Sequence, residues 1–93
     1  MAVVGAVITV AVTATLLSAT ETDTASGQTL LVTNTDAASI FLGGAAVTTA
    51  TGYPLATGIS LPWPVCLGPS DQLYAISAAG TSAGAVKVIR VGV

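Results

Sequence analysis

Apolar and small polar residues alternate over much of the chain, with the two-residue period of a β-strand. The alternation is clearest between residues 8 and 16, where one face would carry Ile8, Val10, Val12, Ala14 and Leu16. This run is also rich in β-branched residues, which pack well in strands and lose side-chain freedom in helices. We therefore predict a strand in this region.

The first part of the chain has a second interpretation. Residues 1–20 contain no charged side chain, and about 20 apolar residues are enough for a helix to cross a bilayer. A helical stripe fits this alternative and runs through Val3, Val4, Val7, Ile8, Ala11 and Val12. No Lys or Arg flanks the stretch, however, as a signal peptide or a membrane anchor would require. The strand is favoured, and a helix is kept as the alternative.

Short strands separated by turn residues follow. They are predicted at 29–34, 39–42, 65–67, 72–77 and 85–91, with a further extended piece at 47–49 and a bend at Gly58 within 55–61. The acidic segment 18–28 is expected to be a solvated loop.

Two connections between these strands are predicted to be hairpins. Asn34 and Asp36 can bond their own backbone, which indicates a tight turn over 35–38. The segment 78–84 contains Gly80 and Gly84 and is expected to be a second hairpin loop.

The predicted fold class is all-β: a small antiparallel β-sandwich or barrel of six to seven short strands. One domain covers 1–93, and residues 1–7 also fit an N-terminal arm. Pro62 and Pro64 exclude their segment from a central strand, because proline supplies no ladder donor. Lys87 and Arg90 put one charge on each face of the last strand, which predicts an edge or interface strand.

Charge is scarce: the chain has two basic and four acidic side chains, whereas an ordinary domain has about a quarter of its residues charged. Two cations are too few to expect nucleic acid as a partner. The surface must be built largely from Thr, Ser, Ala, Gly and Val, which protects poorly against self-association. This composition favours a component of a larger assembly, and the alternative is a monomer with a Thr and Ser surface.

Candidate chemistry is sparse. The chain has no His, so no Ser-His or Cys-His pair can form. Glu21 and Asp23 are too few for calcium, which takes about six or more oxygen ligands. Asp36 and Asp71 occupy turn positions, which favours backbone bonding over a glycosidase carboxylate pair. We expect no enzymatic activity, no catalytic residue, no cofactor and no metal site.

The remaining candidates are contact residues. Trp63 lies between two prolines and could plug the core, anchor a partner protein or stack on a sugar. Together with Val3 and Val4 it is predicted to contact a partner. Cys66 stands alone in an apolar segment and is expected to be buried and inert.

Several short motifs form a pattern of strands and turns over residues 8–93. They are LVTNTD (31–36), IFLGG (40–44), VTT (47–49), TGYPL (51–55), Gly58, LYAI (73–76) and Gly80-Thr81. This pattern resembles small β-domain virion proteins of tailed bacteriophages, in which a strand ending in Asn precedes V/I-x-L-G-G, V-T-x-x-T-G and a late L-Y-A strand. The segment 62–67 departs from the pattern by being more apolar, and we expect it to mark a contact specific to this protein.

The resemblance implies a virion structural protein. The favoured role is a capsid decoration (cement) protein on the head surface, which stabilises the shell through contacts with the major capsid protein or other virion proteins. Such a protein is expected to form a homo-oligomer, a trimer being favoured, without nucleic acid or membrane partners. The alternatives are a tail or head-fibre subunit, and a small lysis-type protein that spans the membrane with residues 1–20.

Overall fold

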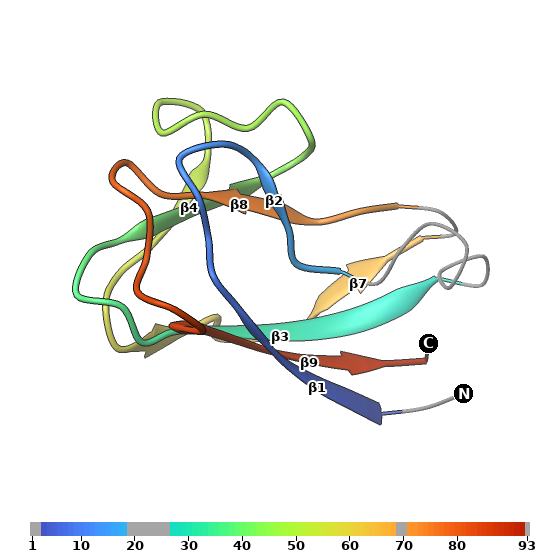
Figure 1. The fold of residues 1–93 in the computed structure, drawn as a ribbon. Coiled ribbons are helices and arrows are strands. Elements are labelled where there is room, and N and C mark those ends of the chain that lie inside the picture. Colours follow the sequence, from blue (N-terminus) through green and yellow to red (C-terminus); the bar gives the residue numbers. More distant parts are fainter. Residues whose placement is uncertain (1–2, 19–26, 69–70, 93) are drawn as a thin grey trace.

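A computed structural model describes residues 3–18, 27–68 and 71–92 (Figure 1). These ranges contain nine short strands and no helix, so the all-β prediction is confirmed with more strands than expected. The strands are β1 (Val3–Ile8), β2 (Thr15–Leu16), β3 (Gln28–Asn34), β4 (Ile40–Gly43), β5 (Tyr53–Leu55), β6 (Ile59–Ser60), β7 (Val65–Leu67), β8 (Tyr74–Ile76) and β9 (Val86–Val91).

The strands form two antiparallel sheets that lie one above the other in Figure 1. Sheet A has the order β1-β9-β3-β6. β7 also pairs directly with β3, at the start of β3, whereas β6 pairs with its end. Sheet B has the order β2-β8-β4-β5. The β-sandwich prediction is therefore confirmed, and its central strand in sheet A is β3, which pairs with three other strands.

The core lies between the two sheets. Along β3, Leu30, Val32 and Asn34 are buried, while Leu31 and Thr33 between them are half-buried. This alternation is what the two-residue period of a strand dictates when one face is covered. The main buried cluster consists of Val10, Leu17, Leu30, Val32, Ile40, Leu42, Leu55, Leu61, Ala75, Val86 and Val88.

Both predicted hairpins are wrong, because each connection crosses from one sheet to the other. β3 belongs to sheet A and β4 to sheet B, and the chain crosses again between β8 and β9. The turn chemistry itself is present: the Asp36 N–H donates to Asn34 Oδ1 at 3.0 Å, and the Ala38 N–H donates to Asp36 Oδ2 at 3.2 Å. A local turn signal does not distinguish a hairpin from an arch between sheets.

The single strand predicted over 8–16 is also wrong. The chain leaves sheet A after Ile8 and enters sheet B at Thr15, with irregular backbone between them. Thr15 Oγ1 accepts from the Ala11 N–H and donates to the Thr13 carbonyl, so the chain turns locally before it enters β2. Val12, expected on the apolar face, is 58% exposed.

Residues 3–18 contain strands and no helix, contrary to the helical alternative. Among the described residues, none forms a helix long and apolar enough to cross a membrane. Val3 to Val7, within the range that also fitted an N-terminal arm, pair with β9 along their whole length.

The last strand, β9, is not an edge strand, because it lies between β1 and β3. Its two charges are accommodated differently: Lys87 is exposed on the outer side, and Arg90 is half-buried on the inner side. The predicted extended piece at 47–49 is instead a turn region. The bend at Gly58 is confirmed by its φ of 71°. The segment 62–64 lies outside the strands, as its prolines predicted.

Candidate functional site

The outer face of sheet A, the side that points away from sheet B, is formed by every second residue of its strands. The pairing aligns these residues in three rows across the sheet. The rows are Val3, Val91, Thr29 and Cys66; Gly5, Ile89 and Leu31; and Val7, Lys87, Thr33 and Ser60.

Aliphatic side chains on this face are unusually exposed. Val3 and Val7 are 67% and 63% exposed, and Ile89 and Val91 are 42% and 41% exposed. Single exposed aliphatic residues are normal, whereas large contiguous patches of them are typical of contact sites. These four occupy neighbouring positions on the two paired strands β1 and β9.

Lys87 is the one charged side chain that the described residues place on this face. Its Nζ lies 3.4 Å from the Gly84 carbonyl oxygen. A shallow depression beside it is lined by Gly5, Ala6 and Val7 of β1. The β1–β9 part of the face is thus mainly apolar, carries one charge and is hollowed at Gly5.

The residues predicted to contact a partner do not lie together. Val3 and Val4 are on β1, whereas Trp63 is in the loop between β6 and β7, at the opposite edge of sheet A. Trp63 is 72% exposed, so its alternative role as a core plug is wrong. The nearby Leu61 is buried in the core instead, and its N–H donates to the Val32 carbonyl at 3.0 Å.

The sequence-based prediction missed Val7, Ile89 and Val91. The available signal was their two-residue spacing with other apolar residues, yet spacing alone does not say which face of a strand is covered. Only the pairing of β1, β9 and β3 shows that these residues share one uncovered surface.

Cys66 is exposed, which contradicts the expectation that it is buried. It aligns with Thr29 in β3, so its side chain lies on the outer face, while the flanking Val65 and Leu67 pack against the core. The alternation within this three-residue strand places the thiol outside.

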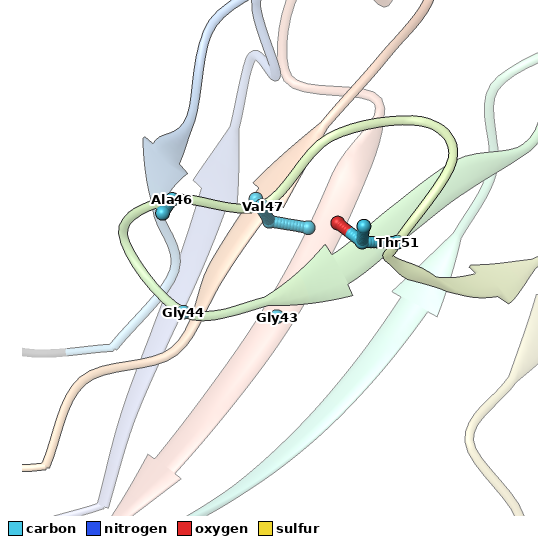
Figure 2. A pocket seen from close by; sticks show the side chains of 5 residues that line it. All are labelled: Gly43, Gly44, Ala46, Val47 and Thr51. Atoms are coloured by element: carbon cyan, nitrogen blue, oxygen red, sulfur yellow. The ribbon is translucent and has the colours of Figure 1, made fainter.

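The loop between β4 and β5 is packed tightly around two glycines. A Cβ at Gly43 would lie 2.8 Å from Val47 Cγ2, and one at Gly52 would lie 2.5 Å from Phe41 Cβ. The Val47 and Thr51 side chains point toward one another across a small hollow (Figure 2). The motifs IFLGG and VTTATG therefore form one structural unit.

The hollow in this loop offers no chemistry. It is lined by Gly43, Gly44, Ala46, Val47 and Thr51, none of which is an acid, a base or a metal ligand at neutral pH. The nearby hydroxyl groups of Thr48 and Thr51 are 3.0 Å apart and bond each other. Their role is to hold the turn.

Asp36 links loops that are distant in sequence. Its carboxylate accepts from the Ser82 N–H at 2.9 Å and from the Ala38 N–H at 3.2 Å, and its carbonyl accepts from Thr57 Oγ1. The Ser82 N–H is the main reason that the pKa of Asp36 lies below its ordinary value, and the Ala38 N–H adds to it. Asp36 is thus a structural carboxylate.

The sequence predicts turn or loop positions for the other acidic residues as well. Asp71 accepts from the Gly68 N–H at 3.0 Å, so the turn prediction for both Asp36 and Asp71 is confirmed. Glu21 and Asp23 lie outside the described residues. Within the described ranges, no three His, Cys, Asp or Glu side chains gather as a metal site would require.

Comparisons of the chain with protein-family models, with curated proteins and with solved structures each find no match. The resemblance to small β-domain virion proteins accordingly stays a prediction from the motifs.

Proposed function

We propose that this protein is a virion structural protein, specifically a capsid decoration protein that binds and stabilises a bacteriophage head shell. The observation that carries this proposal is the outer face of sheet A, with its neighbouring exposed Val and Ile side chains. Such a surface gains free energy when another protein covers it. The partner is the major capsid protein or another virion protein, and the role is binding without catalysis.

Two further observations support the proposal. The chain has only six charged side chains, which suits a surface buried among neighbours more than one facing water. Gly43, Val47 and Gly52, which belong to the motifs that resemble virion proteins, pack against one another in a single loop.

The energetics indicate a weak contact for each copy. Covering a half-exposed Val or Ile contributes about 1 kcal/mol, half of a typical full burial. Four such side chains give about 4 kcal/mol, which corresponds to millimolar affinity before other costs. An oligomer that binds through several copies at once would multiply this contact into stable attachment.

The test is retention on purified head shells by co-sedimentation, followed by a heat challenge of the particles. We expect wild-type protein to sediment with the shells and to raise their disruption temperature. Ile89→Glu places a charge in the outer face and should weaken retention about tenfold, equivalent to about 1.4 kcal/mol. Val12→Glu, at an exposed aliphatic residue outside sheet A, is the matched control and should bind like wild type. Absence of wild-type retention, together with unchanged particle stability, would refute the proposal.

A tail or head-fibre subunit is the second candidate. The open edge of sheet A at β1 favours it, because a strand of a neighbouring fibre protein can add there. Counting copies in purified particles separates the two roles: hundreds of copies indicate decoration, and a handful indicates a tail or fibre.

A further inference from the structure

β1 is the free edge of sheet A. It is paired with β9 on one side, and no described strand pairs with it on the other. Natural edges are usually blunted by charges, prolines or short strands. β1 has six residues with no charge and no proline, whereas the opposite edge consists of two short strands, β6 and β7, separated by Pro62 and Pro64. Of the two edges of sheet A in the described residues, the β1 edge is the one open for strand addition.

The pairing pattern shows which backbone groups face this edge. The Thr35 N–H donates to the Ala85 carbonyl at 3.0 Å, so the odd-numbered residues of β9 direct their backbone groups toward β3. The even-numbered residues of β9 therefore face β1, where they pair with Val4, Ala6 and Ile8. Hence Val3, Gly5 and Val7 direct their N–H and C=O groups to the free edge.

We propose that two copies of this chain pair through β1, antiparallel and across a two-fold axis that passes through Gly5. In this register Val3 meets Val7 of the second copy, Gly5 meets its own equivalent, and about six backbone hydrogen bonds form. All the outward backbone groups of β1 are then satisfied. A register centred on Ala6 leaves Val3 opposite Thr9, which lies beyond the strand.

Gly5 supports this register independently. A Cβ at Gly5 would meet nothing within 4 Å, and its φ is not in the left-handed region. Glycine inside a strand costs about 0.5–1 kcal/mol relative to alanine, and nothing within the described chain requires it here. Strand glycines often mark the close approach of another backbone. At the two-fold axis, Gly5 is the residue at which the two chains meet.

Charge also permits the pairing. β1 is uncharged, and the nearest charge on the outer face is Lys87, in the row of Val7. In the dimer, Val7 lies at opposite ends of the two paired strands, so the two lysines stand on the order of 20 Å apart, from strand spacing and rise. That separation exceeds the Debye length of about 8 Å at physiological salt.

The pairing joins two A sheets into one and doubles the outer face. It does not depend on the proposed virion role. A two-fold contact closes as a dimer, whereas the trimer expected from the resemblance needs a head-to-tail contact. The two oligomers are therefore distinguishable in solution.

The first test is sedimentation equilibrium over a range of protein concentrations. We expect wild-type protein to form a dimer, and Gly5→Pro to remain a monomer because proline removes an outward N–H without breaking a bond to β9. Circular dichroism and thermal unfolding check that this variant folds. Val12→Lys, at an exposed aliphatic residue elsewhere, should dimerise like wild type.

The second test fixes the register by cross-linking in a Cys66→Ser background. Gly5→Cys places two thiols opposite each other, with Cα atoms about 5.5 Å apart, within disulfide range. Val3→Cys places them about four residues apart along the strands, about 13 Å, and should not cross-link. Covalent dimer from Gly5→Cys alone supports the proposal.

Three results would overturn it: a wild-type monomer or trimer at all concentrations, equal cross-linking of both variants, or dimerisation of folded Gly5→Pro. A wild-type monomer whose binding to shells is lost in folded Gly5→Pro, which leaves the outer-face side chains in place, would assign the β1 edge to a strand of another protein. A wild-type protein that forms the dimer but does not bind shells would instead refute the decoration role alone.

Discussion

Arg90 of β9 donates two hydrogen bonds to the carbonyl oxygen of Leu17, from Nε at 3.0 Å and from Nη2 at 2.8 Å. Leu17 directly follows β2 of sheet B and is fully buried, and its N–H donates to the Leu73 carbonyl at 2.9 Å. One guanidinium group thus ties the inner side of sheet A to the chain that leaves sheet B. This explains why a charged residue lies on the inner face of β9.

Replacing this arginine should destabilise the fold. Arg90→Met keeps the aliphatic length and removes both donors, so we expect a loss of about 1.5–3 kcal/mol in the free energy of unfolding. For a domain of this size each kcal/mol lowers the Tm by about 4–8 °C. Lys87→Met, on the exposed outer side of the same strand, is the control and should change stability by less than about 0.5 kcal/mol. Equal effects of the two substitutions would contradict the role of Arg90.

The lowered pKa of Asp36 predicts that the free energy of unfolding depends on pH. Because its folded pKa is lowered, its stabilising contribution is complete above the ordinary value of 3.8 and is lost as pH falls through the lowered folded pKa. Asp36→Asn lacks this contribution. The difference in Tm between wild type and Asp36→Asn should therefore be largest at pH 5–7 and shrink below about pH 4.

Thermal unfolding of both proteins between pH 2 and pH 7 measures this difference. Asp71→Asn, which removes a carboxylate from an exposed turn, controls for the loss of one negative charge. Parallel curves for wild type and Asp36→Asn would show that the bonds to Ser82 and Ala38 do not favour the ionised carboxylate.

The local structure of this chain could be predicted from the sequence much better than its pairing. β3 and β9 were predicted almost to the residue, because each has apolar residues at two-residue spacing between turn residues. One of the three strands that pair with β3 is β9, which begins about fifty residues after β3 ends, and no local pattern encodes that pairing. For the same reason the Asn34-Asp36 turn was interpreted as a hairpin although it connects two sheets.

The candidate site was less predictable still. Alternation shows that a strand has two faces, but the covering sheet decides which face is buried. Trp63 was identified from its type and its neighbouring prolines, and its role as a partner contact stays a prediction. The outer face of sheet A depends on β1, β9 and β3 being adjacent, and no local pattern encodes that adjacency.

The glycines of the β4–β5 loop give a paired prediction. Gly52→Ala should destabilise the protein by about 1–3 kcal/mol, because the new Cβ would lie 2.5 Å from Phe41 Cβ and force a shift. Gly44→Ala is the matched control, since its Cβ would meet nothing within 4 Å. Urea unfolding measures both, with the m-value as a check on the denatured state. Similar midpoints for the two variants would mean that the loop relaxes around Gly52.

The exposed position of Cys66 predicts the reactivity of its thiol. In native wild-type protein, a maleimide should label Cys66 at a rate comparable to that in the urea-unfolded protein, because the side chain lies on the uncovered outer face. The control is Val32→Cys combined with Cys66→Ser, which puts a thiol of similar size at a fully buried position. Its labelling should follow the rate of unfolding and stay far slower under native conditions. Mass spectrometry of samples quenched over time gives both rates. Protection of Cys66 equal to that of the buried thiol would show that the outer face is covered at β7. The β7 end of the outer face would then no longer belong to the proposed contact surface.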